Sequence, residues 1–224
     1  MALFIVSAPS GSGKSTLVYE LMHQVSGLSF SVSYTTRAPR GSEVNGREYF
    51  FIDRRQFEAM IAGGEFLEHA EVFGNCYGTT WAFLEQAGRE GRDLVLDIDV
   101  QGARQVKQRF PDAVSIFIAP PDRATLSRRL TGRGLDAPDA IEQRLQVASR
   151  EIAAYNGYDY VVINDRLEES VAQLCAIVRC GRGGGSGSAA GRDCDLAETC
   201  RQSRAGERLR VVLTSFGLPA PDPH

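Results

Sequence analysis

The stretch that decides the fold is Ser7-Ala8-Pro9-Ser10-Gly11-Ser12-Gly13-Lys14-Ser15-Thr16, called here the phosphate loop. It follows an apolar run at 3–6 and leads into an amphipathic run at 17–22, which predicts strand, tight turn and helix. Glycines let backbone N–H groups approach an anion, and the first helical turn adds N–H donors without partners. Lys14 adds a positive charge and Ser15 a hydroxyl for Mg²⁺. The pattern predicts a phosphate site, although Ala8 replaces the usual first glycine; a turn that binds nothing is the alternative.

Composition and charge set broad limits on the protein. The chain has 224 residues, of which 43% are hydrophobic and 24% charged, and its formal net charge is −3. This composition is that of a globular protein with a sizeable core, and the charge argues against a general nucleic-acid binder. No apolar run approaches the roughly 20 residues that a membrane span needs. We therefore expect neither nucleic acid nor membrane as a partner.

The cysteines and the first residues bear on the compartment. The chain has five cysteines, an odd number, and they form no C-x-x-C pair. This pattern favours neither a disulfide framework nor a zinc site. Met1 and Ala2 run directly into the first apolar segment, without a charged leader. The sequence predicts a reduced, cytoplasmic protein.

Buried strands alternate with helices along most of the chain. Continuous apolar runs predict parallel strands at 3–7, 93–98, 113–118 and 160–163. Helical periodicity predicts helices that begin after Gly13 and at 81–89, 100–109, 123–130, 138–155 and 167–178. Asp122 is expected to cap the fourth of these helices. This order predicts an α/β fold, with a parallel sheet flanked by helices.

The segment 33–80 has a different character, with short alternating runs and turn signals. We expect a strand at 30–34, and a hairpin around Asn45-Gly46 that ends in a strand at 48–52. Asp53 followed by Gln56 resembles a capping box that opens a short helix. A second alternating run occupies 65–73. These features predict a small, partly antiparallel insert.

The tail from Cys180 onward departs from this pattern. Six of the eleven residues from 181 to 191 are glycine, a composition that disfavours a packed structure. We expect a flexible tail over 180–224, with at most one strand or helical turn at 207–216. A shifted reading frame or an artificial addition near Cys180 would produce such a sequence, as would a genuine extension.

Taken in order, several motifs resemble those of the guanylate kinase family. The resemblance covers residues 3–179 and rests on the phosphate loop and on five further stretches: Ser33-Tyr34-Thr35-Thr36-Arg37-Ala38-Pro39-Arg40, Glu43-Val44-Asn45-Gly46, Tyr77-Gly78-Thr79, Asp97-Ile98-Asp99-Val100-Gln101-Gly102, and Arg129…Arg133-Gly134…Arg144. It implies a P-loop kinase core (1–32, 81–122 and 147–179), a mixed β/α insert that binds GMP (33–80) and a helical lid (123–146).

The resemblance implies a reaction, its substrates and the residues that serve it. The family transfers a phosphoryl group from Mg·ATP to GMP, and the matching GMP contacts are Ser33, Arg37, Arg40, Tyr49, Glu68, Tyr77, Thr79 and Asp97. The matching ATP contacts are Ala8, Pro9, Ser10, Gly11, Ser12, Gly13, Lys14, Ser15, Thr16 and Asn164. Catalytic roles fall on Lys14, Arg37, Arg129, Arg133 and Arg144. The matching magnesium contacts are Ser15 and, through water, Asp99.

Several of these residues also have a structural interpretation without a functional role. Arg37 and Arg40, taken alone, are ordinary solvated loop charges. Glu68 could be an exposed strand position, because the run around it alternates weakly. Asp99 could cap the helix that follows it, and Asn164 could belong to a turn. His69 and Trp81 near the site are expected to pack; Leu135 replaces the threonine that is more frequent in the family.

Two other functions remain as alternatives. One is a guanylate-kinase-like interaction module without catalysis, against which the intact Lys14 argues. The other is a related P-loop kinase with another phosphate acceptor, against which Arg37, Arg40, Glu68 and Tyr77 argue. The sequence leaves a homo-oligomer open.

Overall fold

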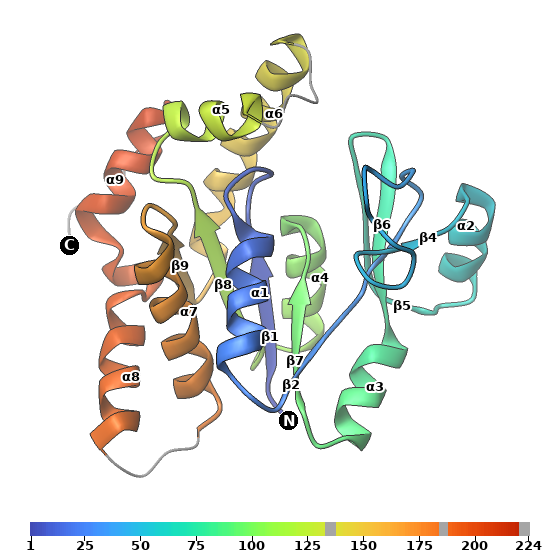
Figure 1. Cartoon of the computed structure of the whole chain (residues 1–224), viewed down its shortest axis with the longest axis horizontal. Helices are drawn as coiled ribbons and strands as arrows, with labels where there is room; N and C mark the ends of the chain where they lie inside the picture. Colours follow the sequence, from blue (N-terminus) through green and yellow to red (C-terminus); the bar gives the residue numbers. More distant parts are fainter. Residues whose placement is uncertain (133–137, 184–187, 220–224) are drawn as a thin grey trace. The chain divides into compact units, whose positions relative to one another are not determined.

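The computed structural model describes residues 1–132, 138–183 and 188–219 of the chain (Figure 1). The chain divides into two compact units, and the division falls within the first strand. Unit 1 contains Met1–Ile5 and Gly27–Ala113, and unit 2 contains Val6–Ser26 and Val114–His224.

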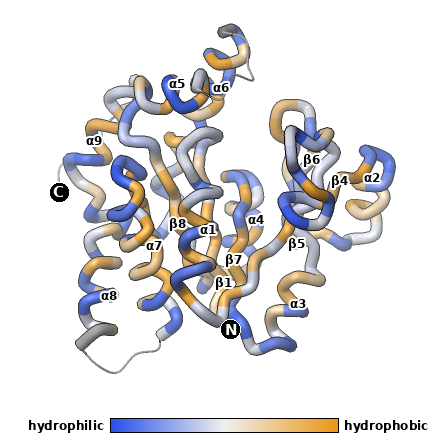
Figure 2. The backbone as a smooth tube through the Cα atoms, in the orientation of Figure 1, coloured by the Kyte–Doolittle hydropathy of each residue, from blue (hydrophilic) through white to orange (hydrophobic). Residues whose placement is uncertain are grey.

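A five-stranded sheet has the order β2-β7-β1-β8-β9. Its strands are β1 (Leu3–Ser7), β2 (Leu28–Phe30), β7 (Asp93–Asp97), β8 (Val114–Ala119) and β9 (Tyr160–Ile163). In unit 1, β2 and β7 pair in parallel, and in unit 2, β8 and β9 do the same. Every residue of β1 and β9 is buried, and Figure 2 shows hydrophobic residues along the strands of this sheet. The apolar runs predicted four of these strands, β1, β7, β8 and β9, to within one residue at each end, and the predicted α/β fold class is confirmed.

Helices follow the strands much as the periodicity predicted. They are α1 (Lys14–Gln24), α3 (Trp81–Arg89), α4 (Val100–Arg109), α5 (Arg123–Thr131), α6 (Pro138–Ala153) and α7 (Leu167–Gly181). The Asp122 carboxylate accepts a hydrogen bond from the Thr125 N–H at 2.6 Å, as expected of the cap of α5. The helix predicted to reach residue 155 ends at Ala153, and a 3-10 turn continues to Gly157.

A second, four-stranded sheet in unit 1 has the order β4-β3-β6-β5. It contains β3 (Tyr34–Thr35), β4 (Phe50–Phe51), β5 (Phe66–Val72) and β6 (Asn75–Thr80), and helix α2 (Arg54–Ala62) lies between β4 and β5 in the chain. A small apolar core holds α2 to this sheet: Phe57, Met60, Phe66 and Cys76. The Asp53 carboxylate accepts from the Gln56 N–H at 2.7 Å, which confirms the predicted cap.

Two predictions in this region are wrong. The strand expected at 30–34 is two strands in two sheets, since β2 ends at Phe30 and β3 begins at Tyr34. The hairpin expected at Asn45-Gly46 does not form, because β3 and β4 pair in parallel. The Asn45 side chain instead accepts from the Phe51 N–H at 2.8 Å and closes a local loop.

The antiparallel hairpin of this sheet joins β5 and β6. Its turn lies at Phe73 and Gly74, which both have positive φ (51° and 74°). Positive φ at both central residues is the geometry of turns that match the twist of paired strands. The sequence signal for the hairpin of this sheet is therefore Gly74-Asn75 rather than Asn45-Gly46.

The tail packs where it is described, contrary to the expectation from its glycines. It contains α8 (Ser188–Thr199), a 3-10 turn (Gln202–Arg204) and α9 (Gly206–Ser215). Its buried side chains include those of Ala197, Cys200, Leu209, Val212 and Leu213. Five of the six glycines at 181–191 precede α8, and the apolar residues after them suffice for packing.

Backbone bonds attach the tail to the last strand of the parallel sheet. The Val161 N–H donates to the Cys200 carbonyl at 2.8 Å, and the Gln202 N–H donates to the Asp159 carbonyl at 3.0 Å. The tail therefore pairs with β9 on its outer edge, since β9 ends the strand order. Arg201, at the centre of this pairing, lies over the Tyr160 ring at 4.4 Å from the ring centroid.

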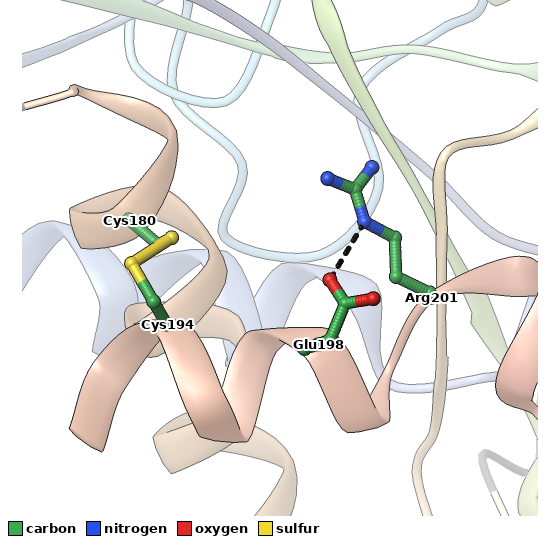
Figure 3. Close-up of a disulfide and its surroundings, with 4 residues drawn as sticks. All are labelled: Cys180, Cys194, Glu198 and Arg201. Carbon is green, nitrogen blue, oxygen red and sulfur yellow. Dashed lines mark hydrogen bonds and ion pairs between the residues drawn. A yellow bond between two sulfur atoms is a disulfide. The ribbon is translucent and has the colours of Figure 1, made fainter. Parts of the chain in front are cut away.

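A disulfide joins Cys180 at the end of α7 to Cys194 in α8 (Figure 3). The expectation of fully reduced cysteines is therefore wrong for this pair. The two residues are 14 apart in sequence, and the pairing of helices α7 and α8 brings their Cα atoms to 5.1 Å. Cys76, Cys175 and Cys200 are free and buried. Among the described residues, no helix has the length and apolar character to cross a bilayer.

Candidate active site

The phosphate loop connects β1 to α1 in unit 2, as the sequence predicted. Gly11 and Gly13 both have φ of 91°, a conformation that residues with a Cβ adopt at a cost. Gly13 occupies the cap position of α1, and no side chain caps this helix. No side-chain cap therefore competes with an anion for the first turn of α1.

Side chains of the loop differ in their exposure. Ser15 and Thr16 are exposed on the first turn of α1, and Lys14 is half-buried at its start. The Ser12 N–H donates to the Pro9 carbonyl at 3.1 Å, which closes the turn. The Ser12 hydroxyl is buried and has no hydrogen-bond partner among the described residues. Such an atom is suited to an oxygen ligand such as phosphate.

Two side chains from distant elements hold this loop by the Ser12 carbonyl. Asn164, which is only 5% exposed, donates to it through Nδ2 at 2.7 Å. Arg129 of α5 donates to it at 3.5 Å and to the Asn164 carbonyl at 3.0 Å. A Cβ added at Gly13 would lie 2.3 Å from the Asn164 amide nitrogen. The predicted ATP contact of Asn164 stays a prediction, and its amide contacts the loop.

The remaining predicted arginines lie on or beside α5 and α6. Arg144 lies on α6 in the same unit as Arg129. Arg133, together with Gly134 and Leu135, lies outside the described residues. Of these three predicted catalytic arginines, Arg129 contacts the phosphate loop through the Ser12 carbonyl.

Three buried polar side chains lie together in unit 1; we call Ser33, Glu68 and Thr79 the base cluster. Glu68 pairs with Thr79 across β5 and β6, and the Thr79 hydroxyl lies 3.1 Å from that of Ser33. Glu68 is 3% exposed, so the alternative of an exposed strand position is wrong. The pairing register shifts between Phe66 and Glu68, and such a bulge explains the weak alternation in the sequence.

Arg37 is buried and held by several groups of unit 1. It donates to Glu43 at 2.9 Å and to the Ala38 carbonyl at 2.7 Å, and lies over the Tyr49 ring at 5.4 Å. Burial lowers the pKa of Arg37, but the Glu43 carboxylate and Tyr77 outweigh it and raise this pKa. Arg37 is therefore not a solvated loop charge.

The loop around Arg37 places the other predicted phosphate contacts near it. The Tyr49 and Tyr77 rings lie 5.9 Å apart, edge to face. The Arg40 side chain is exposed, and its backbone N–H donates to Glu43 at 2.7 Å. Burial raises the pKa of the Glu43 carboxyl, but the bonds from Arg37 and Arg40 dominate and lower it below its ordinary value. Sequence reasoning gave Glu43 no role; its signal is a carboxylate close in sequence to two arginines.

Asp97 and Asp99 lie where β7 ends, and both are half-buried. Asp99 caps α4, because its Oδ1 accepts from the Gly102 N–H at 2.7 Å. The capping role is thus present, and the water-mediated magnesium role stays a prediction. Of the two residues expected to pack, Trp81 contacts Phe110 and Arg109, while His69 is exposed.

Comparisons with known proteins agree on one family. Residues 1–180 match the family model for guanylate kinase. A guanylate kinase of Koribacter versatilis is 54% identical over 221 residues, covering 96% of this chain and 95% of that protein. One of Dechloromonas aromatica is 52% identical over 177 residues, covering 79% of this chain and 88% of that protein.

A solved structure agrees with the sequence relatives. The crystal structure of guanylate kinase from Anaplasma phagocytophilum superposes with a TM-score of 0.67 at 36% identity, over 80% of this chain and 85% of that one. The Koribacter alignment includes most of the tail, so the tail is shared with that relative. With the phosphate loop, the base cluster and these likenesses together, the chain belongs to the guanylate kinase family.

Proposed function

We propose that this protein transfers the γ-phosphoryl group of Mg·ATP to GMP and releases ADP and GDP. The observation that carries the proposal is the base cluster, a buried carboxylate beside two hydroxyls in a chain that also has a phosphate loop. GMP binds unit 1 through the base cluster, Asp97, Arg37, Arg40, Tyr49 and Tyr77. ATP binds unit 2 through the phosphate loop.

Glu68 selects the base. A carboxylate accepts hydrogen bonds from the N1–H and 2-amino groups of guanine at once. Adenine has neither donor at those positions, so AMP would leave a buried carboxylate without them. A site built to hydrogen-bond its substrate can reject an analogue that lacks the donors by about 10⁴-fold.

The charged groups of unit 2 serve the transfer itself. Lys14, Arg129 and Arg144, together with Arg133, neutralise charge on the phosphoryl oxygens in a loose, in-line transition state. The acceptor is already a phosphate anion, so no side chain acts as nucleophile or strong base. Arg37 holds that anion and offsets the repulsion between the two phosphate chains.

Magnesium, when bound, neutralises phosphate charge and orients the chain of phosphates. The residues present fit it, because the exposed Ser15 hydroxyl and the half-buried Asp99 carboxylate are oxygen donors, which Mg²⁺ prefers. Ser15 would offer its hydroxyl to the ion, and Asp99 would act on it through water.

The proposal keeps the domain roles predicted from the sequence. Residues 33–80 form the GMP-binding insert and 123–146 the lid, around a core of 1–32, 81–122 and 147–179. The partners are ATP and GMP, with neither nucleic acid nor membrane, and the chain acts in the cytoplasm. A homo-oligomer is compatible with these roles.

A coupled assay of ADP release with ATP, Mg²⁺ and each of GMP, AMP, CMP and UMP tests the proposal. We expect turnover with GMP alone, and we expect Glu68→Gln to lose most of it. Equal rates with AMP would reject the role of Glu68. Calorimetric binding of GMP without turnover would favour the interaction module, and turnover of none of the four with intact folding would favour another phosphate acceptor.

A further inference from the structure

Strand β5, which carries Glu68, ends the strand order of its sheet, so only one of its edges pairs with a strand. Its other edge meets helix α4. The Gln105 side chain of α4 binds the backbone of His69 twice. Its Oε1 accepts from the His69 N–H at 3.3 Å, and its Nε2 donates to the His69 carbonyl at 2.7 Å. The Gln105 amide thus bonds as a neighbouring strand's peptide group would.

Two further side chains of α4 continue this contact on either side. Arg109 donates to the Leu67 carbonyl, and Gln101 Nε2 donates to the Glu71 carbonyl at 3.3 Å. We call these three side chains the α4 row: Gln101, Gln105 and Arg109.

The α4 row matches the strand by its spacing. Its members are four residues apart on the helix, a rise of about 6.0 Å. Their backbone partners are two residues apart on β5, a rise of about 6.7 Å. The spacing of the helix side chains therefore matches that of the strand carbonyls over three contacts. Helix α4 takes the place of a further strand along this edge.

Gly102 lets the Glu68 carboxylate lie close to the same helix. A Cβ added at Gly102 would lie 2.1 Å from Glu68 Oε2. Gly102 is fixed in turn by the bond from its N–H to Asp99. The bulge after Phe66 and the space at Gly102 thus act on one side chain, because the first turns Glu68 inward and the second gives it room.

From this arrangement we propose that α4 sets the base specificity of the enzyme through β5. The α4 row fixes the register of β5 at the bulge, and Gly102 fixes where the Glu68 carboxylate lies. Gln105 and Gly102 are positioning residues for guanine recognition, and both act through Glu68. The inference rests on the proposed role of Glu68 as the reader of guanine.

The test compares GMP with IMP, whose base keeps N1–H and lacks the 2-amino group. In Gln105→Met, we expect KM for GMP to rise about tenfold, the effect of one misplaced hydrogen bond to a charged group, with kcat within about twofold. The ratio of kcat/KM for GMP to that for IMP should fall with it. Gln108→Met is the matched control, since Gln108 is an exposed glutamine of α4 outside the α4 row, and its ratio should stay unchanged.

Gly102→Ala probes the same idea without removing a side-chain hydrogen bond. The new Cβ crowds the Glu68 carboxylate whatever the role of Gly102, so the melting temperature does not separate the two accounts, whereas a purely structural role predicts an unchanged ratio. We expect a lower ratio, because the Glu68 carboxylate must move. Glu68→Gln tests the proposed role of Glu68 itself, apart from the positioning role of Gln105 and Gly102. If Glu68→Gln abolishes the preference for GMP over IMP while the Gln105 and Gly102 variants both keep it, the positioning role is wrong. If Glu68→Gln also keeps the preference, the proposed role of Glu68 as the reader of guanine is wrong, and the positioning role falls with it.

Discussion

The phosphate loop and the base cluster differ in the groups that they use for binding and in what fixes their shape. The loop binds through backbone N–H groups, and its shape depends on Gly11 and Gly13 at positive φ. The base cluster binds through side chains, and its shape depends on strands that pack and pair around them. A phosphate accepts hydrogen bonds from almost any side, whereas a base must be read along one edge. The loop should therefore be sensitive to backbone changes and the cluster to changes in side-chain orientation.

The largest effect is expected for Lys14→Ala. It removes the positive charge of the loop, and we expect kcat to fall about a thousandfold with an unchanged melting temperature. Lys107→Ala is the matched control, because Lys107 binds the Ala113 carbonyl at 2.6 Å in unit 1. The control should lower the melting temperature slightly and keep kcat. A near-normal rate in Lys14→Ala would remove the loop from the mechanism.

Gly13→Ala should sharpen the claim that the loop works through its backbone. The new Cβ strains a residue at φ of 91° and displaces the Asn164 amide. We expect a loss of about a hundredfold in kcat/KM for ATP, read by the same assay. Gly74→Ala carries similar strain at φ of 74° with open space around the Cβ, so it should destabilise without affecting ATP. Equal kinetics in the two variants would contradict the comparison.

Asn164→Ala should have a smaller effect of the same kind. It removes the bond to the Ser12 carbonyl and leaves Arg129 as the remaining holder of the loop. We expect KM for ATP to rise about tenfold and KM for GMP to stay constant. The exposed Asn156 provides the control variant Asn156→Ala. A rise in KM for GMP of the same size would show that the two regions are not independent.

The smallest effect concerns the pH dependence of stability in unit 1. The pKa of Glu43 lies below its ordinary value of 4.5 because Arg37 and the Arg40 N–H outweigh burial. A carboxyl with a lowered folded-state pKa stabilises above its ordinary pKa and loses this contribution as the pH falls through the folded value. Chemical denaturation should therefore show a gap between the protein and Glu43→Gln that is constant above pH 4.5 and narrows below it. A gap that widens in acid would contradict the assigned ion pair.

Local signals in the sequence were enough for much of the fold. The caps at Asp53 and Asp122 and the apolar runs of β1 and β9 act within a few residues, so the sequence predicted them. Asn45-Gly46 is also a local signal, but there the Asn45 side chain closes its own loop and no hairpin forms.

Contacts between distant residues were beyond the sequence pattern. Asn164 binds Ser12 across 152 positions, and the tail contacts α5 through the bond from the Arg123 N–H to the Ser215 hydroxyl, across 92 positions. The family resemblance named the residues of the base cluster. The bulge that turns Glu68 inward and the α4 row required the pairing register and the side-chain contacts.

The pairing of the tail with β9 has a consequence for contacts between molecules. A strand that ends a sheet offers its peptide groups to any neighbouring chain and can seed aggregation. Here Cys200 and Gln202 already occupy the groups at Val161 and Asp159. At these positions the backbone groups of β9 are therefore already bonded and not available to a strand of a second molecule. The tail thus protects this edge of the sheet against pairing between molecules.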